Sequence, residues 1–190
     1  RHTTGERQLS VTQVMAALKP FIEDPSYKKV LHNAKFDAHV LYMEGLILRG
    51  IYMDTQIAFH ILNENEPSKR LKDLANKYAK YLGVEPENDT FGTLFGKSTF
   101  DTVPHIIALV YAAKDTHLTF KLAKFIEQQF NRPHLSGIKK LYFEMENPLL
   151  ERVIEMEQTG FLLNSQTVID SAIDVMKAEA ADYEKELLET

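Results

Sequence analysis

The chain has 190 residues and a net charge of −5, with 44% hydrophobic residues, 26% charged residues and no cysteine. This composition is that of an ordinary globular protein; it excludes disulfides and thiolate metal sites, and it argues against a broad, sequence-independent grip on nucleic acid, which needs a basic surface. No apolar run approaches the roughly 18 residues of a membrane-spanning helix, so we expect no membrane partner. The absence of cysteine fits an intracellular protein, and the length suffices for one medium domain, or one domain and part of another.

The first third of the chain alternates predicted helices with short extended runs. Ser10 and Gln13 form a capping box at the start of an apolar-faced helix that extends to about residue 22. Residues 28–32 are strand-like, and residues 34–44 are helical again, with Asn33 as the expected cap. Residues 47–53 form a second extended run, after which Asp54 caps a helix to about residue 62. This third of the chain therefore supplies two short strand candidates, each followed by a helix.

The rest of the chain is predicted to be mostly helical. Residues 70–81 are amphipathic, whereas residues 83–103 have the weakest periodicity. The longest helical pattern runs from about residue 105 to residue 130, and another helix extends to about residue 159, where Gly160 stops it. Because the helices beyond residues 131–136 have little strand structure to pack on, a domain boundary is expected in that segment.

The last predicted helix, residues 165–189, has an apolar seam without a partner. Its residues recur at spacings of three and four, as in a coiled coil: Ile169, Ile173, Met176, Ala180, Tyr183 and Leu187. Such a seam needs a second helix, and none follows it in the sequence. We therefore expect self-association, or packing on a neighbouring molecule, through this helix.

One acid lies on the apolar face of the longest helix. Asp115 shares that face with Ala108, Tyr111, Leu118, Leu122 and Phe125. Burying an unpaired carboxylate among apolar neighbours costs several kcal/mol. Asp115 therefore lies at the edge of the stripe in water, has a charged partner, or ligates a cation, and spacing alone leaves these alternatives open.

Asp37 is a second acid beside an apolar stripe, on the predicted helix of residues 34–44. If Asp37 and Asp115 converge, they could hold Mg²⁺ or Mn²⁺, which prefer oxygen ligands and can activate water for attack on a phosphodiester. Tyr111 lies one turn before Asp115 and could aim its hydroxyl at the same water.

Other candidate sites carry weaker signals. No pair of the seven histidines has the spacing of a zinc protease, so a histidine metal site is disfavoured. Lys69, Arg70 and Lys72 form a basic cluster that fits either a solvated helix start or a phosphate contact. Phe91 lies in the weakly periodic segment with other aromatic residues, a composition typical of a loop that packs onto the core.

Several segments resemble the proofreading domain of bacterial DNA polymerase I-like (family A) enzymes. Residues 32–37, His-Asn-Ala-Lys-Phe-Asp, are similar to the second exonuclease motif of that family, and residues 111–119, Tyr-Ala-Ala-Lys-Asp-Thr-His-Leu-Thr, are similar to the third. Residues 53–56, 71–75 and 91–97 resemble the connecting segments, and residues 144–160 resemble the segment that opens the polymerase domain. Ribonucleases that share the exonuclease motifs lack this last segment.

The resemblance implies a ribonuclease H-like α/β domain at residues 1–133, lacking its first strands, followed at residues 134–190 by the helical start of the polymerase domain with its first thumb helix. It also implies removal of mispaired 3′ nucleotides by a two-metal mechanism with Mg²⁺ or Mn²⁺. Asp115 and Asp37 would ligate metal, and Tyr111 would orient the attacking water. The implied partners are the DNA primer 3′ end, single-stranded DNA and the rest of the polymerase chain, in the cytoplasm at the nucleoid.

Two residues would contact nucleic acid under this resemblance: Asn33 and Phe91 would touch the unpaired primer end, with Phe91 packing on a base. Lys69 and Arg70, of the basic cluster, are the candidate phosphate contacts. The first exonuclease motif of the family, an acid-x-acid pair, is absent from the chain. Because this leaves two of the usual four carboxylates, we expect the isolated chain to be inactive or nearly so.

Two alternatives remain beside a proofreading polymerase fragment. An RNase D-like exoribonuclease shares the motifs and is disfavoured by residues 144–160. A noncatalytic exonuclease-like module, retained for structure, is disfavoured by the presence of Asp37, Tyr111 and Asp115 together.

Overall fold

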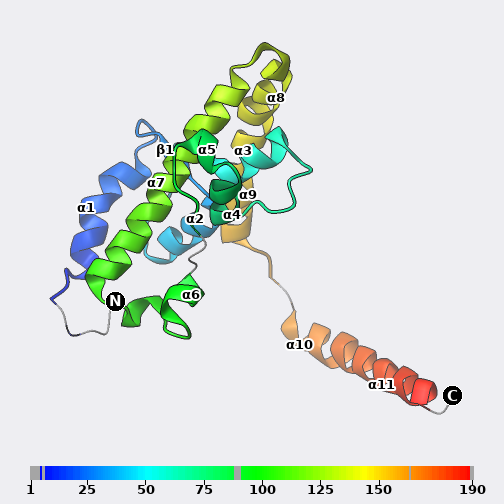
Figure 1. The fold of residues 1–190 in the computed structure, drawn as a ribbon. Helices are drawn as coiled ribbons and strands as arrows, with labels where there is room; N and C mark the ends of the chain where they lie inside the picture. The colour runs from blue at the N-terminus through cyan, green and yellow to red at the C-terminus, as the bar shows by residue number, and fades with distance from the viewer. Residues whose placement is uncertain (1–4, 6, 88–90, 163, 189–190) are drawn as a thin grey trace. The chain divides into compact units, whose positions relative to one another are not determined.

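The computed structural model describes residue 5 and residues 7–87, 91–162 and 164–188. The chain divides between residues 158 and 159 into two compact units. Over the described residues it is mostly helical, with one two-stranded parallel sheet (Figure 1). An α/β fold was expected, and the described residues show its helices and a small parallel sheet.

The sheet of the first unit is built from the two predicted extended runs. Strand β1 (Lys29–Leu31) pairs in parallel with β2 (Ile51–Asp54), with Leu31 opposite Asp54. Helix α2 (Ala34–Met43) makes the crossover between them, as parallel strands require. The carboxyl ends of both strands therefore lie at one edge, where α2 and α3 (Thr55–Leu62) begin.

Helix α1 (Val11–Glu23) precedes the sheet and begins at the predicted capping box. The Gln13 backbone N–H donates to the Ser10 hydroxyl oxygen at 3.2 Å, and the Ser10 backbone N–H donates to the Gln13 side-chain oxygen at 3.1 Å. Both bonds satisfy N–H groups that a helix start leaves without partners. This part of the sequence prediction is confirmed.

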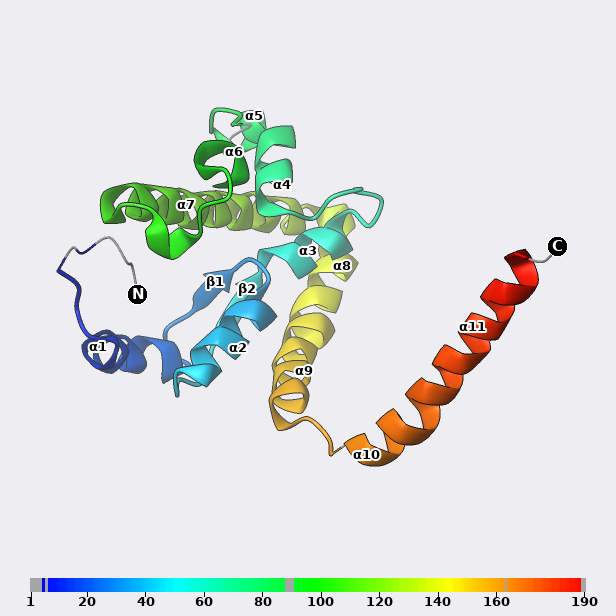
Figure 2. The ribbon, with the colours of Figure 1, turned by 90° about the horizontal axis from the view of Figure 1, so that it is seen from below.

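Helix α7 (His105–Phe130) is the longest element and organises the main core. It contacts β1, α3, α4 (Leu71–Lys77) and α5 (Ala79–Leu82), and Figure 2 shows α4 and α5 on the side of α7 away from the sheet. Its apolar stripe lies inward as predicted, with Ala108, Leu118 and Leu122 buried. The long helix therefore carries Asp115 along the inner face of the molecule.

The helices after residue 131 pack against the preceding elements. A 3₁₀ turn (Pro133–Leu135) leads through α8 (Ser136–Leu141) and a π-helical turn (Tyr142–Glu146) into α9 (Asn147–Thr159). Leu150 and Ile154 of α9 join a second core cluster with Ala34, Ala38, Leu48 and Ile51. These contacts cross residue 133, so the expected domain boundary there stays a proposal. Between α5 and α7 lie the short helix α6 (Phe91–Phe95) and a 3₁₀ turn (Phe100–Thr102).

The second unit is helical and exposes its apolar seam. It contains α10 (Ser165–Thr167), a π-helical turn (Val168–Ile173) and α11 (Asp174–Leu188). Met176, Tyr183 and Leu187 are 67%, 67% and 78% exposed. Across the described ranges, no helix combines the length and apolarity that crossing a membrane requires.

Gly50 is predicted to be essential for the entry into β2. It has a φ of +71°, and a Cβ atom there would lie 2.7 Å from the carbonyl oxygen of Pro25. Gly50→Ala is therefore expected to lower the free energy of unfolding by more than the roughly 1 kcal/mol of the left-handed backbone alone, as measured by urea denaturation. Gly45→Ala is the control, since Gly45 has a φ of +80° but no atom within 4 Å of the added carbon. Equal losses in the two variants would contradict the steric argument.

Candidate active site

A pocket of about 500 Å³ lies at the carboxyl edge of the sheet and brings the two predicted acids together. Asp37 reaches it from the first turn of α2, and Asp115 reaches it from α7. The other lining residues come from β1, from the residue after it, and from α4 and α7: Val30, Leu31, His32, Leu71, Thr116 and Thr119. Two carboxylates 78 positions apart in the sequence therefore line one pocket.

The surroundings of Asp115 suit a metal ligand. Its Oδ1 atom is buried and accepts no hydrogen bond from the described residues, while the Lys72 ammonium lies 3.9 Å away. Burial raises the pKa of the Asp115 carboxyl, and the positive charge of Lys72 partly opposes this rise. A buried carboxylate oxygen without a donor is costly, and a bound cation would remove that cost.

The pKa of the Asp37 carboxyl is raised, as that of Asp115 is. Burial is the larger cause, and the negative charge of Asp54 raises the pKa further. Two carboxylates that are both hard to ionise fit a divalent cation, which offsets their charge. Within the described ranges, no group of three or more histidine, aspartate or glutamate side chains is arranged to hold a metal. The donor set of the pocket is therefore two carboxylates, those of Asp37 and Asp115, whose chemistry suits a divalent cation but which are fewer than three ligands.

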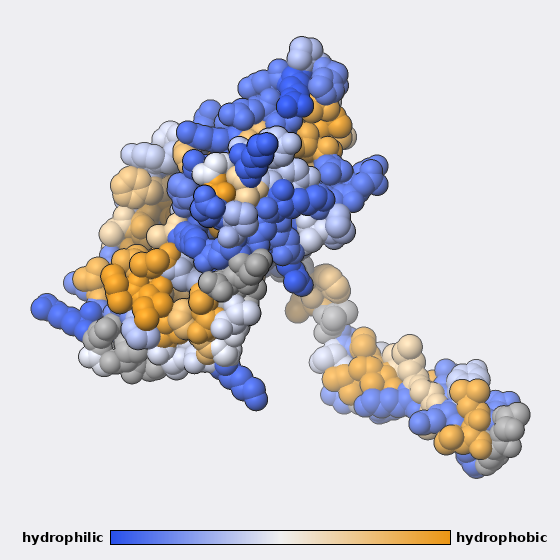
Figure 3. Space-filling model, viewed as in Figure 1, coloured by the Kyte–Doolittle hydropathy of each residue, from blue (hydrophilic) through white to orange (hydrophobic). Residues whose placement is uncertain are grey.

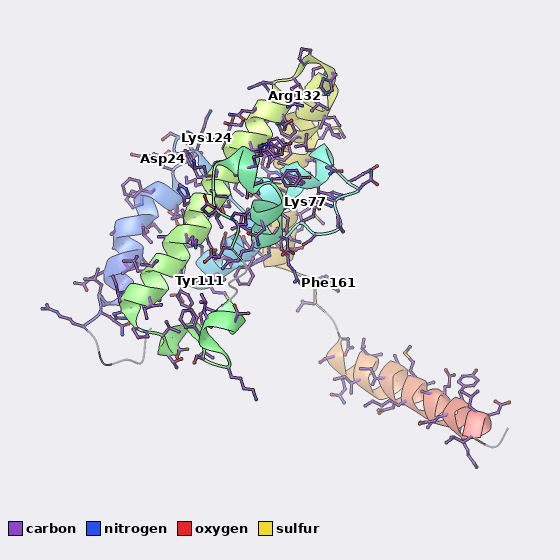
Figure 4. The ribbon with its side chains drawn as sticks, in the orientation of Figure 1. Asp24, Lys77, Tyr111, Lys124, Arg132 and Phe161 are labelled. Atoms are coloured by element: carbon purple, nitrogen blue, oxygen red, sulfur yellow. The ribbon has the colours of Figure 1, made fainter. Side chains whose placement is uncertain are left out.

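Tyr111 lies one turn before Asp115 but packs into an aromatic cluster. Its ring contacts Phe91, Phe95 and Phe100 edge-on, with centroids 5.7, 6.4 and 6.4 Å away. The Lys72 ammonium lies 4.1 Å from the centre of the Tyr111 ring, a cation–π distance. Figure 4 shows the Tyr111 side chain directed from α7 toward α6. Lys72 thus contacts both Tyr111 and Asp115.

The aromatic cluster borders a second, apolar pocket of about 280 Å³. Tyr111 and Lys114 line it with side chains of α6 and the start of α7: Leu94, Phe95, Ile106, Ile107 and Val110. The exposed apolar surface over the first turns of α7 is visible in Figure 3 as an orange patch. The structure therefore places Tyr111 at this pocket, while the carboxylate pocket is lined by Asp37 and Asp115.

Asn33 is the N-cap residue of α2 as predicted, but its side chain does not make the expected cap bond. It occupies the N-cap position in the left-handed region, with a φ of +67°, and makes no side-chain cap bond. The Asp54 carboxylate accepts from the Asn33 and Ala34 backbone N–H groups instead. The Asn33 side chain is exposed beside the pocket-lining His32.

The two predicted phosphate-contacting residues differ in their surroundings. The Lys69 ammonium donates to the backbone carbonyls of Glu64 and Glu66, so it bonds within its own loop. Arg70 is exposed at the N-cap position of α4. Arg70 is therefore the more accessible of the two cations.

Glu66, in the same loop, is predicted to make the protein sensitive to acid. Its buried carboxylate accepts two bonds from the Lys77 ammonium at 2.8 Å and one from the Tyr78 hydroxyl at 2.9 Å. The bonds from Lys77 lower the pKa of Glu66 below its ordinary 4.5. Because the folded-state pKa is depressed, this stabilisation is present above pH 4.5 and is lost as the pH falls through the folded value.

Glu66→Gln is therefore expected to lower the melting temperature at pH 7 but to change it little below the folded-state pKa of Glu66. Thermal unfolding of both proteins across this pH range measures the difference. Glu64→Gln, an exposed position in the same loop, is the control. A difference that is constant with pH would contradict the assignment.

Three residues near the site were not singled out as site residues by sequence reasoning: His32, Asp54 and Lys72. The Thr55 hydroxyl donates to the Leu31 carbonyl at 3.0 Å, so the His32 imidazole must donate to it through Nδ1, at 2.8 Å. His32 Nε2 is left buried without a partner among the described residues, and burial lowers the pKa of the ring. The His32 imidazole therefore lies in the carboxylate pocket, and the only sequence signal for it was its place at the start of the 32–37 segment that resembles an exonuclease motif.

Comparison with known proteins decides the family. Residues 5–131 match the model of a 3′-5′ exonuclease family, a range that contains both carboxylates, Tyr111 and the whole sheet. The chain belongs to this 3′-5′ exonuclease family. Divalent metals are generally used by such exonuclease domains, in agreement with the donor set of the carboxylate pocket.

The similar full-length proteins are DNA polymerases. The chain is 34% identical to DNA polymerase I of Chloroflexus aurantiacus, over 85% of this chain and 17% of the relative. It is 31% identical to DNA polymerase I of a Synechocystis species, over 97% of this chain and 18% of the relative, and 29% identical to that of Pseudomonas aeruginosa, over 83% and 17%. The chain thus spans less than a fifth of the length of these relatives.

Proposed function

We propose that this exonuclease chain removes mispaired 3′ nucleotides from DNA as part of a family A DNA polymerase. The convergence of Asp37 and Asp115 in one pocket, inside the family-matched range, carries the proposal. In this interpretation residues 1–133 belong to the exonuclease domain and residues 134–190 to the start of the polymerase domain. The partners are the primer 3′ end, single-stranded DNA and the rest of the polymerase, at the nucleoid.

The carboxylate pocket provides the chemistry. Asp37 and Asp115 would hold Mg²⁺ or Mn²⁺, in a two-metal site that these residues complete only in part. Such ions lower the pKa of bound water and offset the charge that develops on the transferred phosphate. Because both carboxylates are partly removed from solvent, their attraction to a cation is screened less than it would be at the surface.

The residues around the pocket would orient substrate and water. Tyr111, one turn before Asp115 on α7, would direct the attacking water from the neighbouring apolar pocket, where its ring contacts the Lys72 ammonium. Phe91, half-buried against Tyr111, would present a face to an unpaired base, and Asn33 would contact the same strand. Arg70 would contact phosphate through its exposed guanidinium, and Lys69 would do so only by exchanging its carbonyl partners.

Two carboxylates offset only part of the charge of two divalent ions. We therefore propose that the 190-residue chain alone is inactive or nearly so, and that the complete polymerase is the active form. Self-association through the seam of residues 165–189 stays a proposal, supported by the exposure of Met176, Tyr183 and Leu187.

The test compares substrates with the complete polymerase that contains this sequence. End-labelled DNA primers with a mismatched or a matched 3′ nucleotide, and an RNA strand of the same sequence, are incubated with Mg²⁺ or Mn²⁺. We expect mismatched DNA to be shortened fastest. Preferred hydrolysis of RNA would support the RNase D-like alternative, and no hydrolysis of any strand would support a noncatalytic module.

A further inference from the structure

The Asp54 carboxylate binds the starts of two helices at once. It is 1% exposed, at the end of β2. It accepts from the backbone N–H groups of Gln56 at 2.8 Å and Ile57 at 3.3 Å, which caps α3. It also accepts from those of Asn33 at 3.2 Å and Ala34 at 2.7 Å, which lie at the start of α2. The four bonds therefore join the start of α2 to the start of α3.

The two carboxylate oxygens of Asp54 accept different bonds. Oδ1 accepts from α3 and from Asn33, whereas Oδ2 accepts from Ala34 alone. Helix α2 has no cap from its own Asn33, whose backbone is left-handed. The only side-chain cap found for α2 over the described residues therefore comes from Asp54, and Asp37 follows one turn later on the same helix.

A second set of contacts holds Asp54 itself. The Asp54 backbone N–H donates to the Tyr142 hydroxyl at 2.8 Å, and the Asn147 side-chain amide donates to the Ile51 carbonyl at 2.9 Å. Tyr142 and Asn147 are five residues apart across a π-helical turn, which places them on one face. Both lie beyond the family-matched range of residues 5–131. Helices after the exonuclease segment thus fix the strand end that positions Asp54.

We propose that Asp54 is a positioning residue that sets the place of Asp37 in the carboxylate pocket, and that Tyr142 and Asn147 anchor it. We assign Asp54 no metal contact, because it is not among the residues that line the carboxylate pocket and both of its oxygens accept backbone N–H bonds. The expected effect on activity rests on the proposed exonuclease function. The structural part of the inference, that Asp54 stabilises the start of α2, does not depend on that function.

The variants Asp54→Asn and Asp54→Ser distinguish the effect of Asp54 on α2 from its effect on α3. Asparagine and serine are both good N-caps, so each can still cap α3, but neither offers a second carboxylate oxygen to Ala34. Asp24→Asn is the matched control, because the Asp24 carboxylate accepts a backbone bond from Ser26 at 2.8 Å in an exposed turn. Figure 4 labels Asp24 on the turn after α1.

The first readout is amide hydrogen exchange of the complete polymerase, followed by mass spectrometry of peptides covering α2 and α3. In both Asp54 variants we expect α2 to exchange at least about 10-fold faster, while α3 and the Asp24→Asn protein stay unchanged. Equal acceleration in both helices, or none in α2, would overturn the inference. This readout does not depend on whether the protein is a nuclease.

The second readout is excision of a mismatched 3′ nucleotide as a function of Mn²⁺ concentration. Loss of a residue that orients a metal ligand typically costs about 10- to 100-fold in metal affinity or activity. We expect a rise in the Mn²⁺ concentration for half-maximal rate and a lower kcat, with an unchanged KM for DNA. A wild-type protein without nuclease activity would refute the proposed function alone, whereas active variants with wild-type Mn²⁺ dependence would refute the positioning role.

Discussion

Asp115→Asn in the complete polymerase is expected to slow 3′-5′ excision by about 100-fold or more while leaving nucleotide incorporation unchanged. An amide is a weaker ligand than a carboxylate, and a catalytic metal contributes several kcal/mol to transition-state stabilisation. Each ~1.4 kcal/mol corresponds to a factor of ten in rate. Single-turnover excision of a mismatched 3′ nucleotide in Mg²⁺ measures the loss.

A stability measurement distinguishes lost metal binding from unfolding. Burial raises the pKa of Asp115, so the stability linked to this group is present at low pH and is lost as the pH rises through the folded-state pKa. Replacing the carboxylate by a neutral amide removes this penalty. In EDTA at pH 7 the melting temperature of Asp115→Asn should therefore equal or exceed that of the wild type.

Glu127→Gln, further along α7, is the matched control. The Glu127 carboxylate accepts from the Tyr52 hydroxyl at 2.8 Å, outside the carboxylate pocket, and glutamine can keep this bond. We expect wild-type excision in this variant. An Asp115→Asn protein that is active, or one that is inactive and also melts earlier in EDTA, would contradict the role given to Asp115.

The sequence predicted what depends on local spacing. The α7 pattern was found to within a residue because 3.6-residue periodicity persists over 26 residues, and the Ser10 cap depends on a bond to a residue three positions away. The same spacing found Asp115 on the inner face of α7. On α2 the spacing was misleading, because the apolar side chains predicted to form a stripe beside Asp37 are exposed, Phe36 by 64% and Met43 by 87%. The resemblance of residues 32–37 and 111–119 to exonuclease motifs then predicted the family that the comparisons confirm.

What the sequence did not predict depends on contacts between distant residues. Asn33 was expected to cap α2 because asparagine is a good N-cap, but Asp54, 20 residues beyond Ala34, has two oxygens in a buried position and takes that role. Lys72 was placed in a basic cluster, yet it lies against Tyr111 and Asp115 because α4 packs on α7. Local propensity gives no information on which helices pack together.

The anchoring role of Tyr142 is a further case, because its partner lies 88 residues away. Tyr142→Phe is expected to lower the free energy of unfolding by about 1–3 kcal/mol, the cost of a buried N–H group that loses its acceptor. The ring keeps its packing against Phe130 and Phe143. Urea denaturation at pH 7 measures the loss, and Tyr81→Phe, at a side chain that is 71% exposed, should change nothing.

Alkaline pH should reduce the difference in stability between the wild type and Tyr142→Phe. Burial raises the pKa of Tyr142 well above its ordinary 10.0, so the stability linked to its hydroxyl is present below pH 10 and is lost as the pH rises further. Phenylalanine has no hydroxyl to ionise, so the stability of the variant should fall less steeply above pH 10. Parallel stability curves for the two proteins would contradict a buried, hydrogen-bonded hydroxyl.

A double-mutant cycle of Tyr142→Phe with Asp54→Asn tests whether the two residues act as one unit. The hydroxyl of Tyr142 holds the backbone of Asp54, and the carboxylate of Asp54 holds α2. If the Tyr142→Phe substitution already shifts the strand end, Asp54→Asn has less left to disrupt. The free energies of unfolding lost in the two single variants should then add up to more than the loss in the double variant. Additive losses would mean that Tyr142 stabilises the core without affecting the position of Asp37.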